Sequence, residues 1–120
     1  MWKLVIKDDE GRQAVVPLKL EEYVLGRKAG SKVRLNERNV SRQHARLHKI
    51  SDDARHAFVL EDLNTANGTF VNGTRISAPK SLNHGDLIQV GDYRLVLQND
   101  ALGDVPVPSA ATAAETDYDP

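Results

Sequence analysis

The sequence predicts an all-β fold, a sandwich or a barrel built from many short strands. Apolar and β-branched runs follow one another at close spacing, and several alternate with the period of two expected of half-buried strands. Helical periodicity over roughly eleven residues or more is missing. The pairs Asn72-Gly73 and Gly91-Asp92 each separate two strand candidates, and Asn-Gly is the strongest short hairpin signal.

The first expected strand covers residues 2–7, where apolar residues occupy the even positions and Val5 is the exception. Residues 14–18 and 23–25 are β-branched or apolar runs. A helix between these two runs could not extend, because Pro17 limits it at the start and Gly26 limits it at the end. The remaining expected strands are residues 33–35, 45–50, 57–60, 69–71, 75–76, a weak 80–82, 87–90 and 93–97.

Length and composition narrow the class of protein. A chain of 120 residues, 40% of them hydrophobic, suits one globular domain with one core. No apolar run approaches the roughly 18 residues that span a membrane, and no secretory signal is visible after Met1. Cysteine is absent, which excludes disulfides and thiolate metal sites. We therefore expect a cytoplasmic protein with no membrane partner.

The charges divide the chain into two parts. All 16 Lys and Arg residues and 12 of the 17 acidic residues precede Asn99, so residues 1–98 carry +4 and residues 99–120 carry −5. The second part is rich in small residues, prolines and acids, which cannot bury enough apolar surface to fold. We expect a basic domain over residues 1–98 that favours an anionic ligand, and a flexible acidic tail or linker over residues 99–120.

Three of the expected turns are crowded with Arg, Ser, Thr, Asn and Gly. Such side chains donate hydrogen bonds and the glycines permit sharp turns, so the set suits an anion. Ser41 and His44 lack the Gly-x-Ser-x-Gly turn of a serine hydrolase, and His48 would lie about 13 Å from His44 on a strand, too far to share a metal. We expect no enzyme, no metal site and no cofactor. The segments are Gly26-Arg27, Val40-Ser41-Arg42-Gln43-His44-Ala45 and residues 62–73.

These segments resemble the signature of the forkhead-associated (FHA) domain, over a region from about Trp2 to Gln98. The resemblance implies a two-sheet β-sandwich of about eleven short strands that binds phosphothreonine peptides with loops at one end. It further implies a non-catalytic, phosphothreonine-dependent interaction module in Ser/Thr kinase signalling. The motifs are Gly26-Arg27, Ser41-Arg42-Gln43-His44-Ala45, Asn67-Gly68-Thr69, Val71-Asn72-Gly73 and residues 85–91.

In the first loops, the resemblance makes Arg27 the main phosphate contact, because a guanidinium grips two phosphate oxygens and keeps its charge. Ser41 would donate its hydroxyl to the phosphate, and Arg42 would add positive charge. The neighbourhood of Arg38 and Asn39 helps select the residue three places after the phosphothreonine. We hypothesise that one of these two favours an acidic residue there.

In the second loop, the resemblance implies that Asn67 bonds the peptide backbone. Ala66 stands where family members often carry serine or threonine, so either Thr65 compensates or only a backbone N–H remains. Asn72 is placed near the peptide backbone, although its Asn-Gly pair equally predicts a purely structural hairpin turn. Gly26, His44 and Gly68 are expected to support the site, with His44 fixing the loop that presents Ser41.

The expected partner is a protein or peptide that contains phosphothreonine, for example a Ser/Thr kinase or its substrate. Self-binding would become possible if Thr112 or Thr116 in the tail were phosphorylated. A phosphate-independent scaffold is an alternative, since Ala66 lacks a hydroxyl. Nucleic-acid binding through the basic loops is less well supported, because these loops contain no stacking aromatic residues.

Overall fold

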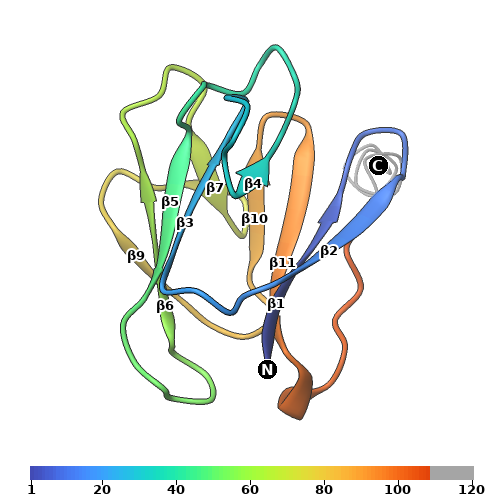
Figure 1. Cartoon of the computed structure of the whole chain (residues 1–120), viewed down its shortest axis with the longest axis vertical. Helices are drawn as coiled ribbons and strands as arrows, with labels where there is room; N and C mark the ends of the chain where they lie inside the picture. Colours follow the sequence, from blue (N-terminus) through green and yellow to red (C-terminus); the bar gives the residue numbers. More distant parts are fainter. Residues whose placement is uncertain (109–120) are drawn as a thin grey trace, which may run out of the picture.

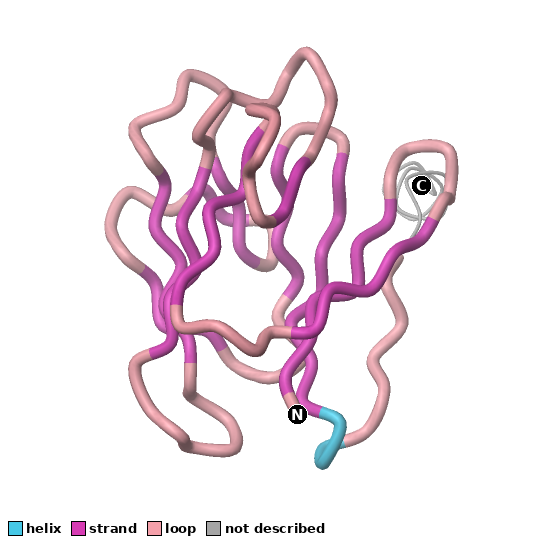
Figure 2. Tube along the Cα trace, in the orientation of Figure 1, coloured by secondary structure: helices cyan, strands magenta, loops and turns pink. Residues whose placement is uncertain are grey.

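The computed structural model describes residues 1–108, which form two β-sheets packed face to face (Figure 1). All the expected strands are present, so the all-β sandwich prediction is confirmed. Within residues 1–108, the 3₁₀ turn η1 (Asp100–Leu102) is the sole helical element (Figure 2). The strands are β1 (Trp2–Lys7), β2 (Gln13–Pro17), β3 (Glu22–Gly26), β4 (Val33–Arg34), β5 (Ala45–Lys49), β6 (Phe58–Asp62), β7 (Thr69–Val71), β8 (Thr74–Arg75), β9 (Lys80–Leu82), β10 (Leu87–Val90) and β11 (Tyr93–Asn99).

The strand order explains how loops far apart in sequence meet. One sheet has the order β2-β1-β11-β10-β7-β8 and the other has the order β4-β3-β5-β6-β9. All pairings are antiparallel except that of β3 with β4. The β3–β4, β4–β5, β6–β7 and β10–β11 loops consequently lie at one end of the sandwich, the upper end in Figure 1.

The core lies between the sheets and is filled by alternating side chains of the strands. Leu4, Leu25, Leu47 and Leu95 are fully buried, and burying a side chain of this kind contributes about 1.5–3 kcal/mol. Phe58 meets Trp2 edge to face, with ring centroids 5.6 Å apart. This packing makes the two sheets a rigid platform for the loops at the upper end.

The packed region continues past Gln98, into the segment that the sequence assigned to the tail. Val105 and Val107 cover Val5 and Val96 on the outer face of the first sheet. Their spacing of two residues turns both side chains towards the sheet, and prolines at positions 106 and 108 favour the extended backbone that this requires. Two valines among acids and prolines are too few to form a recognisable strand pattern in the sequence.

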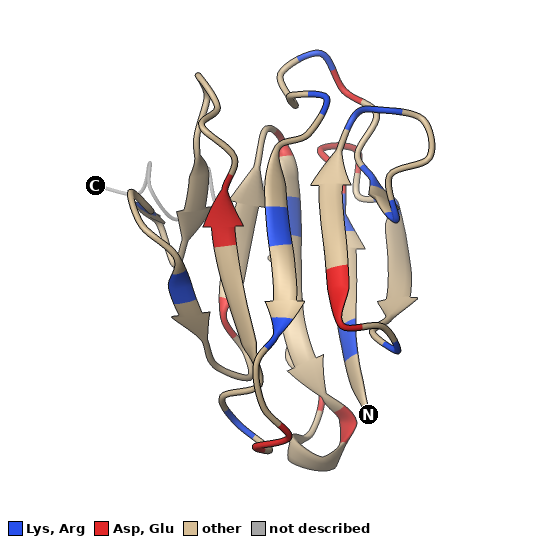
Figure 3. Ribbon diagram, turned by 60° about the vertical axis from the view of Figure 1, so that its left-hand side comes forward, with Lys and Arg blue, Asp and Glu red and all other residues tan. Residues whose placement is uncertain are grey.

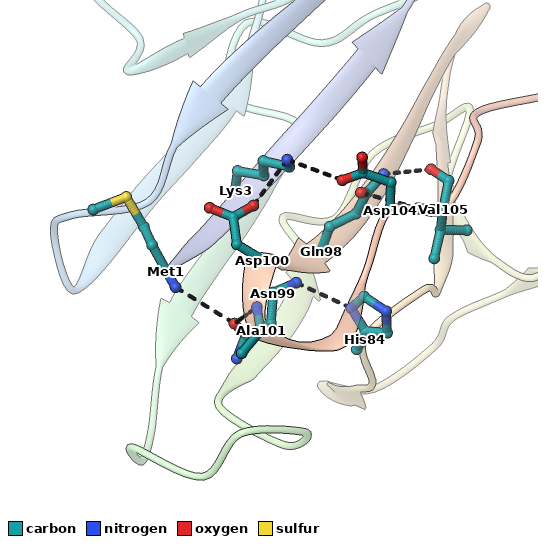
Figure 4. A network of polar contacts seen from close by, with 9 residues as sticks. All are labelled: Met1, Lys3, His84, Gln98, Asn99, Asp100, Ala101, Asp104 and Val105. Carbon is teal, nitrogen blue, oxygen red and sulfur yellow. Dashed lines mark hydrogen bonds and ion pairs between the residues drawn. The ribbon is translucent and has the colours of Figure 1, made fainter.

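Polar contacts hold the same segment in place (Figure 4). The amide of Gln98 pairs with the backbone of Val105, whose N–H donates to Oε1 at 3.1 Å. Lys3 forms ion pairs with Asp100 at 2.9 Å and Asp104 at 3.5 Å. Residues 99–108 therefore lie along the first sheet.

No helix in the described part of the chain is both long and apolar enough to cross a bilayer. The cytoplasmic location expected from the sequence stays a prediction.

Candidate functional site

Arg27 and Ser41 lie side by side at the upper end of the sandwich. The backbone N–H of Arg27 donates to the carbonyl of Ser41 at 3.0 Å, and that of Lys28 donates to the carbonyl of Arg42 at 3.1 Å. Nε of Arg27 also donates to the carbonyl of Val40 at 3.0 Å. This bond fixes the guanidinium beside the serine loop and leaves its two terminal nitrogens available for a ligand.

Gly26 makes this approach of the two loops possible. A Cβ at position 26 would lie 2.1 Å from the carbonyl oxygen of Arg42, which is closer than any real contact. The same glycine accepts a hydrogen bond from the N–H of Leu35 at 2.9 Å. A side chain at this position would push the serine loop away from Arg27, which agrees with the supporting role expected for Gly26.

His44 is fully buried and links the serine loop to the β6–β7 loop. The N–H of Ser41 donates to Nδ1 at 3.0 Å, so Nδ1 is unprotonated. The proton of the neutral ring is then on Nε2, which donates to the carbonyl of Gly68 at 2.8 Å. A single imidazole thus fixes both loops, because each ring nitrogen is committed to one of them.

Asp62, at the end of β6, organises the loop that follows. Its carboxylate accepts hydrogen bonds from the hydroxyls of Thr65 and Thr69, both at 2.7 Å, and from the N–H of Thr65 at 2.9 Å. Burial raises the pKa of the Asp62 carboxyl, but the hydrogen bonds from Thr65 and Thr69 outweigh it, so the pKa lies below its ordinary value. Asp62 is not among the residues that the sequence predicts for the site, although an Asp three residues before a Thr is a common turn signal.

This network uses the single O–H donor of Thr65. The hydroxyl donates to Asp62 and accepts a hydrogen bond from the N–H of Gly68 at 3.0 Å. It is therefore not free to replace the hydroxyl that Ala66 lacks. Among the described residues, the backbone N–H groups of Ala66 and Asn67 have no acceptor, so they are available as donors beside the missing hydroxyl.

Asn67 joins the two loops on the outside of the site. Its Nδ2 donates to the carbonyl of Asn39 at 2.9 Å. The side chain of Asn39 turns towards the β10–β11 turn, where a Cβ on Gly91 would lie 2.7 Å from its Oδ1. Arg38, in contrast, is exposed next to Ser41's loop. Of the two residues expected to select a peptide side chain, Arg38 is thus the more exposed, and Asn39 is half-buried with its Oδ1 covered.

Asn72 lies apart from the other candidate residues. Strand β7 runs away from the β6–β7 loop, and Asn72 follows its far end with a φ of 50°. Its Nδ2 donates to Asp86 at 3.1 Å, and its Oδ1 accepts from the N–H of Leu87 at 2.9 Å. Of the two interpretations left open by the sequence, these contacts favour the structural hairpin turn.

The loops at this end carry positive charge that is not neutralised by ion pairs. The ion pairs among the described residues involve only the cations Lys3, Arg12, Arg46 and Lys49. Several blue segments in Figure 3 lie in the loops at the upper end. The surplus favours an anionic ligand, because unpaired cations raise the local positive potential. The cations in these loops are Arg27, Lys28, Lys32, Arg38 and Arg42, and Arg34 stands at the end of β4.

Within residues 1–108, no three His, Cys, Asp or Glu side chains lie close enough together to hold a metal ion. The site therefore offers hydrogen-bond donors and guanidinium groups, which suit recognition of an oxyanion.

Comparisons with known proteins identify the family of the chain. The family model of the FHA domain matches residues 23–91. The oxoglutarate dehydrogenase inhibitor of Corynebacterium jeikeium is 33% identical over 99 residues, which are 80% of this chain and 63% of that protein. Other curated relatives are much longer, and the chain spans a fifth or less of their length.

Solved structures of similar sequence share the fold. A structure described as an analysis of phosphothreonine-dependent FHA domain interactions has a TM-score of 0.63 and 28% identity, covering 81% of this chain and 96% of that one. The crystal structure of the FhaA FHA domain, complexed with the intracellular domain of a second protein, has a TM-score of 0.66 and 30% identity. It covers 82% of this chain and 100% of that one.

Proposed function

The chain belongs to the FHA-domain family, and on that premise we propose that its upper loops bind a phosphothreonine in a partner protein. The observation that carries the proposal is the direct contact between the loops of Arg27 and Ser41, whose backbones are hydrogen-bonded at 3.0 Å. Phosphate carries about −1.5 to −2 charges near pH 7, which matches the surplus of cations around these two residues.

The proposed phosphate contacts come from separate loops. The terminal nitrogens of Arg27 grip phosphate oxygens, the hydroxyl of Ser41 donates to one oxygen, and Arg42 adds positive charge. The N–H groups of Ala66 and Asn67 complete the set from the second loop. Each charge-assisted bond is worth about 1.5–3 kcal/mol before the cost of ordering the peptide. We expect a dissociation constant of about 1 µM, near −8 kcal/mol.

Residues beside these phosphate contacts would select the peptide. Asn67 already bridges the loops through Asn39, so its amide is positioned to bond the backbone of a peptide as well. Arg38 is exposed and would favour an acidic residue three places after the phosphothreonine. A peptide panel that varies only this position tests the preference, which is wrong if aspartate gives no advantage.

The chemical class of the partner follows from the same site. We propose a phosphothreonine-containing protein in Ser/Thr kinase signalling, either a kinase or its substrate. Thr112 and Thr116, which could make the tail a ligand for the chain itself once phosphorylated, lie outside the described residues.

A comparison of captured proteins tests this function. Wild-type protein and the Arg27→Ala variant are used as baits, and phosphorylated threonines are mapped in the captured proteins. We expect phosphothreonine proteins to be enriched on the wild type alone, and prior phosphatase treatment to remove them. Capture of the same proteins by both baits would instead favour the phosphate-independent scaffold, which the absence of a hydroxyl at Ala66 keeps as a second candidate.

A further inference from the structure

Arg75 reaches from β8 to the loop that precedes β7. Its Nη2 donates to two successive backbone carbonyls, that of Thr65 at 3.1 Å and that of Ala66 at 3.3 Å. The base of the side chain is held by the β7–β8 hairpin, where Arg75 pairs with Phe70 and the N–H of Ile76 donates to Thr69 at 2.9 Å. Arg75 therefore connects a firmly paired strand to an exposed loop.

Gly68 provides the space through which the Arg75 side chain passes. A Cβ on Gly68 would lie 2.5 Å from Nε of Arg75 and 3.0 Å from its Cδ. The φ of Gly68 is also +84°, a conformation that side chains disfavour. The bare face of this glycine and the guanidinium stem are thus complementary in shape, and the contact does not depend on a ligand.

The two carbonyl bonds have a consequence for the opposite side of the loop. A trans peptide unit is planar, and its C=O and N–H point in opposite directions. Fixing the carbonyl of Thr65 therefore fixes the N–H of Ala66, and fixing the carbonyl of Ala66 fixes the N–H of Asn67. Both N–H groups then point away from Arg75.

The Ala66 and Asn67 N–H groups have no acceptor among the described residues, and neither has the N–H of Asn64 earlier in the same loop. Ala66 supplies no hydroxyl, and that of Thr65 is already committed to Asp62 and Gly68. Backbone donors are consequently the main contribution of this loop, and their direction matters more than it would beside a hydroxyl side chain.

We propose that Arg75 is a positioning residue for phosphothreonine recognition, which orients the Ala66 and Asn67 N–H groups without touching the ligand. The proposal rests on the proposed function for its ligand, but the orientation of the loop is a property of the free protein. The sequence alone does not connect Arg75 with the site. The two come together only in the fold, because the hairpin turn at Asn72-Gly73 returns the chain to the β6–β7 loop.

The test compares Arg75→Ala, Arg75→Lys and Lys80→Ala in the full chain. Lys80 is an exposed cation on β9, so its variant controls for the loss of one positive charge. Calorimetry measures binding of a synthetic peptide with phosphothreonine at its centre, aspartate three places later and alanine elsewhere. Urea unfolding establishes that each variant is folded, and NMR records the amide signals of residues 65–68 without ligand.

We expect Arg75→Ala to weaken binding about fivefold to tenfold, as for the loss of a pair of hydrogen bonds. Arg75→Lys should recover most of the affinity, because an ammonium group can also donate to both carbonyls. Lys80→Ala should stay within about twofold of the wild type. In the free protein, Arg75→Ala should shift the amide signals of residues 66 and 67.

Unchanged amide signals together with unchanged affinity in Arg75→Ala would overturn the proposal. Unchanged amide signals with weaker binding would overturn it as well, since Arg75 would then contact the phosphate directly. If the wild type does not bind the peptide, the proposed function is wrong, and Arg75 then has no role in phosphothreonine recognition. The amide signals would still show whether Arg75 orients the loop.

Discussion

His44 donates a hydrogen bond from Nε2 to the backbone carbonyl of Gly68 across 2.8 Å. The other ring nitrogen accepts from the N–H of Ser41 at 3.0 Å, so the two loops proposed to hold the phosphate are joined through one buried side chain. The relationship makes the site a single unit, because displacement of either loop would leave buried polar groups without partners.

Replacing this imidazole should therefore harm both stability and binding. His44→Ala leaves the N–H of Ser41 and the carbonyl of Gly68 unpaired and opens a cavity, so we expect the free energy of unfolding to fall by about 2–4 kcal/mol. Urea unfolding measures the change. His48→Ala, in the strand β5 that follows His44 and only half-buried, is the matched control and should change it by less than about 1 kcal/mol. Equal stability of the two variants would contradict the bridging role.

Asp62 should make stability depend on pH. Its pKa is lowered in the folded protein, so its contribution is complete above the ordinary aspartate pKa of about 3.9 and is lost as the pH falls through the lower folded value. We expect Asp62→Asn to lower the free energy of unfolding by about 1–2 kcal/mol at pH 6. The gap to the wild type should narrow below about pH 4.

A smaller change in the same network provides the control. Thr69→Val keeps the shape of the side chain and removes one donor to Asp62, so it should cause part of the loss over the same pH window. Urea unfolding at a series of pH values measures both variants. A gap between Asp62→Asn and the wild type that is independent of pH would show that the carboxylate charge is not what stabilises the loop.

Position 66 offers a gain-of-function prediction. Ala66→Thr restores a hydroxyl to the loop, and we expect it to tighten binding of a phosphothreonine peptide about threefold to tenfold. Ala66→Val has nearly the same shape without the donor and should give no such gain. Calorimetric titration compares the two variants. Identical affinities would mean that this position does not reach the phosphate.

The packing of Val105 and Val107 leads us to propose that the folded domain extends to residue 108 instead of ending at Gln98. A chain ended at residue 98 loses the buried Val107 and the partly buried Val105, and should unfold with a free energy about 1–3 kcal/mol lower than a chain ended at residue 108. Replacing both valines by serine in the longer chain should reproduce the loss. Equal stability of both lengths would place the boundary at Gln98.

Much of the fold could be predicted because the information is local. Alternation in residues 2–7 and the Asn72-Gly73 turn each specify a strand or hairpin from adjacent residues. The segment after Gln98 could not be predicted in this way. Its two valines have no periodic neighbours, and their burial depends on the exposed face of a sheet formed by distant strands.

The residues of the site also divide into those that local sequence predicts and those that depend on distant strands. Arg27, Ser41 and His44 belong to short motifs whose residue types suggest their chemistry, and the structure brings them together. Asp62 holds two threonine hydroxyls of the loop and Arg75 holds two of its backbone carbonyls, so their roles appear only when strands β6 and β8 are in place. The role of Asn72 could not be decided from the sequence, because an Asn-Gly pair is equally compatible with a hairpin turn and with a binding loop.

The central claim is that Arg27 and Ser41 converge on a phosphate group. The most direct test of this claim is a calorimetric titration of the wild type and Arg27→Ala with a threonine peptide in phosphorylated and unphosphorylated form. We predict binding of the phosphorylated peptide at about 1 µM by the wild type, with no measurable binding in the other three combinations. Equal binding of both peptides by the wild type would contradict the claim.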